Sequence, residues 1–266
     1  MSVSYSNTTC RSQDGTALHL QRWTPQGPSS EVLIIHGYAE HGGRYRELAH
    51  QLSHFGAATT TIDLRGHGRS QGQRGYVRKY SEYHLDVAAA VATLSPDLPH
   101  FILAHSNGAV VALDFITQHA PPLDGLILSS PFLGLAQPPP RYKLAICRLA
   151  SKVMDRLPLP NGIDASGLCD DPAMVASYQR DPLIFCIATA GWFREVQAAQ
   201  QRVLDILSLP RTLLFIYGDA DPFASPSANA AYAERLGSGD KTVVAVPGGL
   251  HEVLNQNRSI TLSPAK

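Results

Sequence analysis

The sequence predicts a mostly parallel, doubly wound α/β sheet with an inserted helical cap, and three observations support this fold class. Short runs rich in β-branched and aliphatic residues alternate with segments of helical length, as in sheets whose parallel strands are joined by helices. The alternation is interrupted between residues 131 and 210, where no convincing strand is present. With 266 residues and 44% apolar content, the chain can bury a full core as one domain, or as one domain with an insertion.

The expected elements follow one another in a regular order. An antiparallel hairpin over Val3–Trp23, turning at Asp14-Gly15, opens the chain. Six later runs are expected to form buried parallel strands: Glu31–His36, Ala57–Asp63, His100–His105, Asp124–Ser129, Thr212–Gly218 and Lys241–Val246. Helical periodicity is found between them in Arg44–His54, Ser81–Leu94, Asn107–His119 and Ala228–Leu236.

The interval Pro131–Pro210 is expected to form a cap. It contains helical pieces separated by prolines, such as Pro138-Pro139-Pro140 and two Asp-Pro pairs. Because it leaves the sheet at the C-terminal end of a strand, where α/β proteins bind their ligands, its position favours covering a site. We therefore divide the chain into a core, residues 1–130 and 211–266, and a cap, residues 131–210.

Within the cap, Arg141–Leu157 has the periodicity of a basic amphipathic helix. Arg148, Lys152 and Arg156 share one face with Arg141, and apolar residues gather on the opposite face. The apolar face can pack on the body of the protein while the charges are solvated. Alternatively, the basic face can dock on an anionic lipid surface.

Composition excludes several classes of protein. The 22 Lys and Arg residues balance the 22 Asp and Glu residues, so the chain lacks the overall basic field of a nucleic-acid binder. There is no secretory signal pattern, and no run of the roughly 18–20 uninterrupted apolar residues that a membrane span needs. The cysteines at 10, 147, 169 and 186 are too widely spaced to indicate a zinc site or disulfide framework. We expect a cytoplasmic protein without metal or cofactor that could contact membranes peripherally through the cap.

A candidate nucleophile, Ser106, lies between an expected strand and an expected helix in Ala104-His105-Ser106-Asn107-Gly108. A tight turn of this kind lifts a serine to the edge of the sheet, with the N-terminus of the next helix behind it, provided that small residues stand two positions away on each side. Ala104 is one methyl group larger than the usual glycine. Taken alone, the pentapeptide would also fit a serine that caps the helix.

A serine nucleophile needs a base and a residue that orients the base. The last two expected strands are followed by Asp219 and Asp221 and by His251, respectively. These side chains come after C-terminal strand ends, so they fall at the same edge of the sheet as Ser106, and the chain order Ser, Asp, His is the expected one. Asp221, immediately before a proline, is the expected acid. Asp219 is the alternative and would otherwise fix the loop.

Two backbone N–H groups are candidate donors to the oxyanion that forms during acyl transfer. One belongs to Asn107, at the start of the helix after Ser106. The other belongs to Tyr38, in the loop after Glu31–His36, where Gly37 lets the chain turn.

Two nearby glycine patterns are incomplete forms of nucleotide-binding loops. Gly37–Gly42 has the glycine spacing of a phosphate loop, but Gly43-Arg44 follows where Lys and Ser or Thr are required. Gly66-His67-Gly68 lacks the third glycine of a dinucleotide fingerprint. Neither ligand is expected, and Asp63–Ser70 is interpreted as a turn held by short-range polar contacts.

Taken together, these motifs resemble the monoacylglycerol lipase and lysophospholipase branch of the α/β-hydrolase superfamily, which includes serine aminopeptidase-like hydrolases. The resemblance covers nearly the whole chain and rests on five blocks: His36–Tyr45, Asp63–Ser70, Ala104–Gly108, Gly218–Asp221 and Gly249–Glu252. It implies an α/β-hydrolase fold and a lipase-type lid. It also implies Ser106 as nucleophile, His251 as general base and then acid, Asp221 as orienting acid, and the Tyr38 and Asn107 amides as the oxyanion hole. Asn107 departs from the pattern, because many relatives have Met there.

These observations predict a serine hydrolase that cleaves single-chain acyl esters, such as a monoacylglycerol or a lysophospholipid, through an acyl-enzyme intermediate. Apolar stretches of the cap, Phe132-Leu133, Leu183–Phe185 and Trp192-Phe193, could line an acyl tunnel or belong to the plain core. A small-ester carboxylesterase, an acyltransferase and a peptidase for N-terminal residues are alternatives that use the same chemistry. A non-catalytic ligand-binding relative is the alternative from a different class.

Overall fold

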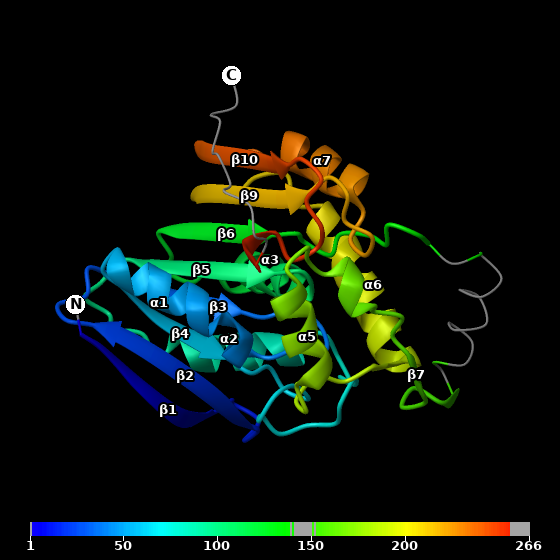
Figure 1. Cartoon of the computed structure of the whole chain (residues 1–266), viewed down its shortest axis with the longest axis horizontal. Coiled ribbons are helices and arrows are strands. Elements are labelled where there is room, and N and C mark those ends of the chain that lie inside the picture. Colours follow the sequence, from blue (N-terminus) through cyan, green and yellow to red (C-terminus); the bar gives the residue numbers. More distant parts are fainter. Residues whose placement is uncertain (1, 139, 141–150, 152, 256–266) are drawn as a thin grey trace.

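A computed structural model describes residues 2–138, 140, 151 and 153–255 of the chain (Figure 1). Its centre is an eight-stranded sheet in the order β1-β2-β4-β3-β5-β6-β9-β10. The strands of this sheet are β1 (Val3–Arg11), β2 (Ala17–Pro25), β3 (Ser30–Ile35), β4 (Ala57–Ile62), β5 (His100–His105), β6 (Gly125–Ser129), β9 (Thr212–Gly218) and β10 (Asp240–Val246). The expected hairpin is β1 and β2, and every expected parallel strand is present.

The pairing makes the sheet mostly parallel. β1 pairs antiparallel with β2, and β2 pairs antiparallel with β4. From β4 through β3, β5, β6 and β9 to β10, all neighbours are parallel. Strands buried on both faces need continuous apolar runs, and Val32–Ile35 in β3 is such a run, at most 5% exposed.

Helices cover both faces of this sheet, as the doubly wound class requires. They are α1 (Arg46–His54), α2 (Glu82–Val91), α3 (Asn107–His119), α5 (Pro172–Arg180), α6 (Ala190–Leu204) and α7 (Pro226–Arg235), with short 3₁₀ turns η1 (Gly42–Tyr45), η2 (Ala165–Gly167) and η3 (Val253–Asn255). α2, α3, α6 and α7 contribute to the main core on one face. On the other face, Leu48 and Leu52 of α1 pack against Val32 and Ile34, and Figure 1 shows α1 in front of the sheet.

The cap contains two strands that the sequence pattern did not reveal. β7 (Pro158–Pro160) and β8 (Ile187–Thr189) form a two-stranded antiparallel ribbon. Proline cannot donate a backbone hydrogen bond and is confined to edge positions in sheets, so Pro158 and Pro160 indicated a break and not a strand. Figure 1 shows the cap elements beyond the tips of the central strand arrows, at the C-terminal edge of the sheet.

We propose that residues 131–210 form the cap and that α6 anchors it to the core. Trp192, Val196 and Ala199 of α6 belong to the main core cluster together with residues of α3. The expected basic helix Arg141–Leu157 lies for the most part outside the described residues. Its Arg156 is described, and the guanidinium lies 4.9 Å from the centre of the Tyr76 ring.

Candidate active site

Ser106 occupies a strained turn between β5 and α3. Its backbone angles are φ 53° and ψ −118°, in the region that residues with a side chain rarely adopt, at a cost of about 1–3 kcal/mol. The turn also brings the start of α3 close to β3, because a Cβ on Gly108 would come within 2.4 Å of the His36 carbonyl oxygen. Ala104, on the other side, is fully buried. The small residues flanking the serine are therefore required by close packing, as the elbow pattern predicts.

The structure brings Ser106, His251 and Asp221 together in one hydrogen-bonded chain. The Ser106 hydroxyl donates to Nε2 of His251 at 2.9 Å, and Nδ1–H of His251 donates to Oδ2 of Asp221 at 2.7 Å. Ser106 follows β5, Asp221 follows β9, and His251 follows β10. Since these strands are parallel, their C-terminal ends place all three side chains at one edge of the sheet.

The two aspartates after β9 have different positions. Oδ1 of Asp221 accepts the backbone N–H groups of Phe223 at 2.8 Å and Ala224 at 3.0 Å, which leaves Oδ2 for His251. Asp219 instead accepts the N–H of Gly248 at 2.6 Å and joins the two loops. The geometry therefore pairs Asp221 with the histidine and Asp219 with the loop.

The surroundings of His251 favour its protonated form. Burial alone would lower the pKa of His251. The negative charge of Asp221, the hydrogen bond from His251 to Asp221, and the carboxylates of Glu252 and Glu40 outweigh burial, so the pKa is raised above 6.5. The neighbouring His105 ring lies 4.8 Å from the His251 ring. Burial, reinforced by the charge of His251, lowers the pKa of His105 to about 4. At neutral pH His105 is therefore uncharged and does not oppose protonation of His251.

The two expected oxyanion donors belong to segments that adjoin Ser106. Asn107 is the first residue of α3, so its N–H has no partner within the helix. Tyr38 follows Gly37, at which an added Cβ would lie 3.2 Å from Cβ of Ser106. The Tyr38 ring stacks on Trp192 with 3.6 Å between ring centres, and its hydroxyl donates to the Ile187 carbonyl at 2.9 Å. Contacts with α6 and β8 thus hold the Tyr38 side chain in place.

A cavity of about 660 Å³ opens above Ser106 and His251. Apolar side chains from residues 131–210 form much of its wall: Phe132, Leu135, Leu159, Ile163, Leu168, Trp192 and Phe193. Leu133 belongs instead to the main core, and Leu183–Phe185 is not among the lining residues. The sequence therefore identified part of the apolar wall.

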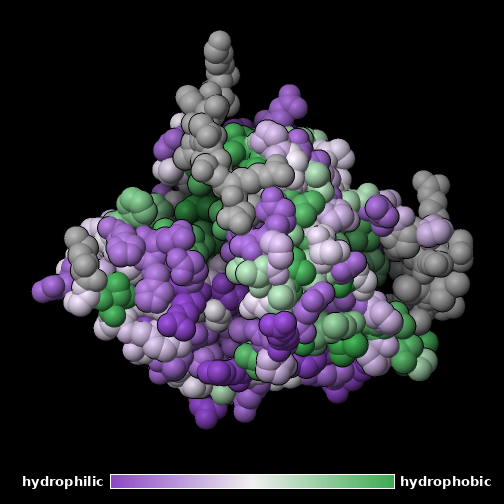
Figure 2. All heavy atoms as spheres, in the orientation of Figure 1, coloured by the Kyte–Doolittle hydropathy of each residue, from purple (hydrophilic) through white to green (hydrophobic). Residues whose placement is uncertain are grey.

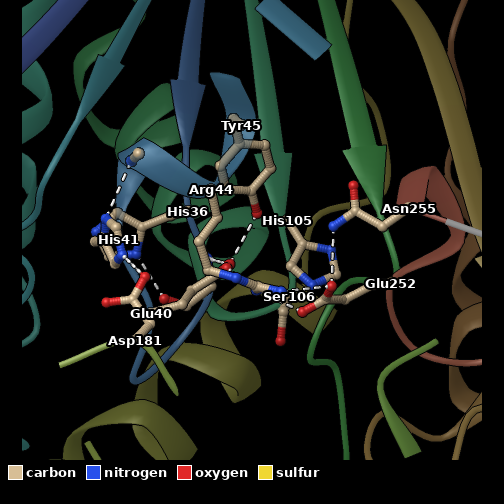
Figure 3. A network of polar contacts seen from close by, with 12 residues as sticks. His36, Glu40, His41, Arg44, Tyr45, His105, Ser106, Asp181, Glu252 and Asn255 are labelled. Atoms are coloured by element: carbon tan, nitrogen blue, oxygen red, sulfur yellow. Dashed lines mark hydrogen bonds and ion pairs between the residues drawn. The ribbon is translucent and has the colours of Figure 1, made fainter. Parts of the chain in front are cut away.

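One group of cavity residues had no role assigned from the sequence. Arg44 forms ion pairs with Glu40 at 2.5 Å and with Glu252 at 2.6 Å. The Tyr45 hydroxyl donates to Glu40 at 2.8 Å. Figure 3 shows these side chains converging beside Ser106. The spacing of four residues between Glu40 and Arg44 was a sequence signal for such a pair, and Glu252 directly follows His251.

The loop Asp63–Ser70 is the turn that the sequence predicts. Oδ1 of Asp63 accepts the N–H of Gly42 at 2.8 Å, and Oδ2 accepts the N–H of Arg69 at 2.8 Å. The Ser70 hydroxyl donates to the Asp63 carbonyl at 2.5 Å. Asp63 therefore closes this turn with one carboxylate oxygen and joins it to η1 with the other.

The described part of the chain shows neither a metal-binding cluster nor a membrane-spanning helix. It contains no cluster of three or more His, Cys, Asp or Glu side chains with the geometry of a metal site. None of its helices has both the length and the apolar character required to cross a membrane.

A mostly parallel sheet that carries a serine on a strand-to-helix elbow, hydrogen-bonded to a histidine and an aspartate from later strand ends, defines the α/β-hydrolase class. Comparison with known proteins places the chain within this class. Residues 26–258 match the family described as "Serine aminopeptidase, S33", and the chain belongs to this family.

Individual relatives agree with this assignment. The monoacylglycerol lipase of Mycolicibacterium smegmatis is 30% identical over 243 residues, which cover 88% of this chain and 85% of that protein. The monoglyceride lipase of Mus musculus is 32% identical over 263 residues, covering 94% and 84%. The crystal structure of the Paleococcus ferrophilus monoacylglycerol lipase has the same fold, with a TM-score of 0.81 at 23% identity over 97% of this chain and 93% of that chain. The chain is an ester hydrolase of the branch to which these lipases belong.

Proposed function

We propose that the protein hydrolyses esters of single-chain acyl lipids, a monoacylglycerol or a lysophospholipid, through an acyl-enzyme intermediate on Ser106. The observation that carries this proposal is the hydrogen-bonded chain from Ser106 through His251 to Asp221 below an apolar cavity. A cavity of about 660 Å³ falls in the range of roughly 300–1,000 Å³ that is usual for small-molecule sites. Its apolar wall suits an acyl chain.

The chemistry follows from the positions of these groups. Oγ of Ser106 attacks the carbonyl carbon of the ester while Nε2 of His251 takes its proton, and Asp221 stabilises the imidazolium. The N–H groups of Tyr38 and Asn107 donate to the oxyanion. The C–O bond to the alcohol then breaks, and His251 returns the proton to the leaving oxygen. In the second half, water gives a proton to His251, attacks the acyl-enzyme and releases the fatty acid and free Ser106.

The acidic residues in the cavity argue against a peptidase. A peptidase for N-terminal residues needs a free carboxylate for the substrate ammonium group. Glu40 and Glu252 line the cavity but both pair with Arg44. Each carboxylate is already hydrogen-bonded by Arg44, so neither is free to bind an ammonium group, and an ester substrate is the better fit.

The decisive experiment compares hydrolysis of a long-chain monoacylglycerol, a lysophospholipid and a short soluble ester by the purified protein and its Ser106→Ala variant. We expect preference for a long-chain substrate and a loss of about 10⁶-fold in kcat on removal of the nucleophile. Ser53→Ala, at a buried serine on α1 whose hydroxyl donates to the Ala49 carbonyl away from the cavity, is the matched control and should keep wild-type activity. Activity on the short ester alone would indicate a carboxylesterase. Acyl transfer to an added alcohol in preference to water would indicate an acyltransferase, and no turnover would favour a non-catalytic relative.

We further propose that the cap contacts the lipid surface that supplies the substrate. Val153 is 81% and Met154 is 54% exposed, and Leu159 lies partly exposed while it lines the cavity. Figure 2 shows apolar surface at the lower right, where Figure 1 places β7. Exposed apolar side chains next to a cavity mouth favour contact with a membrane or partner. The double variant Val153→Ser, Met154→Ser should weaken sedimentation with lipid vesicles and leave hydrolysis of a soluble ester unchanged; unaltered sedimentation would reject the contact.

A further inference from the structure

The groups around Ser106 come from distant parts of the chain, and one buried ionic network connects them. Glu40 belongs to the loop that carries Tyr38, Arg44 to η1, and Glu252 to the loop that carries His251. Nη1 of Arg44 donates to Oε2 of Glu40 at 2.5 Å and to Oε1 of Glu252 at 2.6 Å, and Nη2 donates to Oε2 of Glu252 at 2.8 Å. One guanidinium therefore joins the two loops (Figure 3).

The network is buried, and its hydrogen-bonding capacity is used internally. The side chains of Arg44, Glu40 and Glu252 are 8%, 5% and 5% exposed. Besides Arg44, Glu40 accepts from the Tyr45 hydroxyl at 2.8 Å, and Glu252 accepts from Asn255 at 2.9 Å. Paired, hydrogen-bonded charges shielded from water interact strongly and in a fixed geometry. The three side chains therefore act as one rigid unit.

Glu40 transmits the position of this unit to the loop beside the serine. Its Oε1 accepts the N–H of Gly37 at 2.6 Å. A Cβ added to Gly37 would lie 2.8 Å from Glu40 Oε1 and 3.2 Å from Cβ of Ser106. The loop is thus held between Glu40 and Ser106, and a displacement of Glu40 moves the peptide that carries the Tyr38 N–H.

Glu252 transmits the position of the ionic unit to His251 and to the cap. It is the next residue after His251, and its own N–H donates to the Leu168 carbonyl of the cap at 2.7 Å. The Arg44 guanidinium lies 4.9 Å from the centre of the Tyr178 ring on α5. The oxyanion loop, the histidine loop and the cap therefore meet at one arginine.

We propose that Glu40, Arg44 and Glu252 are positioning residues that hold the loop of the oxyanion donor Tyr38 in register with the loop of His251. This inference rests on the proposed function, in which Tyr38 and His251 serve the reaction at Ser106. The three side chains do not react with the substrate. Glu40, Arg44 and Glu252 set the distance between the Tyr38 amide and His251, which act on the substrate.

The test uses the full chain and a short soluble ester, so that binding of a long acyl chain does not mask the chemical step. Because loss of an oxyanion donor costs about 10²–10³-fold in kcat and small misplacements cost about 10²-fold, Arg44→Met should lower kcat by about 10²-fold with little change in KM. Arg44→Lys should recover part of the kcat that is lost in Arg44→Met. Combining Arg44→Met with Glu252→Gln should cost little more than Arg44→Met alone, because both changes break the same bridge.

Arg202 provides the matched control. It forms a two-point ion pair with Asp114, at 2.9 Å and 2.7 Å, away from the cavity. Arg202→Met should keep wild-type kcat. An Arg44→Met protein that melts as a folded molecule and keeps kcat within about twofold would overturn the proposal, and so would an equal loss in Arg202→Met. If Arg44→Met does not fold, the Glu252→Gln variant replaces it, because glutamine keeps the size of the side chain and an acceptor oxygen. The same changes in kcat then support or overturn the proposal.

A pH profile distinguishes this positioning role from general structural damage. The carboxylates of Asp221, Glu252 and Glu40 act on His251, Arg44 pairs with the two glutamates, and the ring of neutral His105 lies against the His251 ring. Glu252 raises the pKa of His251 by its negative charge, so Glu252→Gln should move the acid limb of kcat/KM to lower pH. Arg202→Met should leave the limb in place. An unmoved limb in Glu252→Gln would contradict this arrangement.

A second readout separates failure of the inference from failure of the proposed function. A fluorophosphonate probe reacts with an activated serine: the Oγ–P bond forms, fluoride leaves, and the serine proton passes to His251. If the probe labels Ser106 of the wild-type protein but the protein hydrolyses no ester, the proposed substrate class is wrong. The positioning role is then tested by comparing the labelling rates of wild type and Arg44→Met. Arg44→Met labelling as fast as wild type would overturn the positioning role, and labelling slowed about as much as kcat is expected to fall would support it.

Discussion

Two buried arginines of this protein are each paired with carboxylates, and they differ in what those carboxylates are attached to. Arg44 bridges Glu40 and Glu252 at the edge of the cavity, whereas Arg65 bridges two aspartates away from it. Both arginine side chains are 8% exposed. The two arginines are therefore equally buried, and the location of their partners separates the two networks. Arg65 has a third carboxylate, Glu82, at 3.5 Å.

The partners of Arg65 join parts of the body of the fold. Asp14 lies in the turn between β1 and β2, and Asp86 lies on α2; each accepts from Arg65 at 2.7 Å. Within the described part of the chain, none of these three residues lines the cavity. The two networks therefore differ in what they join: Arg44 joins the loops beside Ser106 and His251, and Arg65 joins the β1–β2 turn to α2.

The largest effect should come from the acid that orients the histidine. Asp221→Asn keeps Oδ1 as acceptor for the Phe223 and Ala224 amides but presents an amide to His251, so kcat should fall by about 10⁴-fold with little loss of stability. Asp219→Asn is the matched change, because an amide oxygen can still accept from Gly248. The kcat values of the two variants on the soluble ester show which aspartate orients the histidine. A greater loss in Asp219→Asn would reverse the assignment of the acid.

Removing the arginine of the remote network should affect stability and spare catalysis. Arg65→Met leaves Asp86 buried without its partner, which should lower the free energy of unfolding by about 3–5 kcal/mol. Urea unfolding measures this, and kcat per folded molecule should be unchanged. Arg78 gives the control, since its side chain is 73% exposed where it pairs with Glu82, and Arg78→Met should cost no more than about 1 kcal/mol. A loss of kcat in Arg65→Met would erase the distinction between the two networks.

The smallest effect concerns the pH at which activity disappears. The pKa of His251 is raised above 6.5, and the reaction requires the neutral imidazole as base. As the pH falls through this raised pKa, His251 becomes protonated and kcat/KM declines, so the acid limb should lie above pH 6.5. The limb should not move in Arg65→Met, since Asp14 and Asp86 do not face His251. An acid limb at or below pH 6.5 in wild type would contradict the influence of the carboxylates.

Much of the fold could be predicted because its signals are local. The apolar runs of β3 and β5 and the periodicity of α3 each lie within one short segment, and parallel pairing follows from their alternation. Ser106, Asp221 and His251 could be chosen because a parallel sheet places the ends of its strands at one edge. The order of these residues along the chain then limited the candidates to a few.

The remainder depends on contacts between distant segments. The β7–β8 ribbon pairs Leu159 with Ala188, and its prolines indicate a loop until the partner strand is known. The network of Arg44 was missed for the same reason, because 208 positions separate Arg44 from Glu252. Neither residue type nor local spacing shows that they meet.

The distance along the chain between Ser106 and His251, 145 positions, has a consequence for synthesis on the ribosome. The elbow and the Asn107 amide emerge early, whereas the histidine that takes the serine proton is made only after β9 and β10. A nascent chain therefore carries a serine no more reactive than any other, because its base has yet to be made. Hydrolysis that depends on the Ser106–His251 pair can begin only when the last strands have joined the sheet.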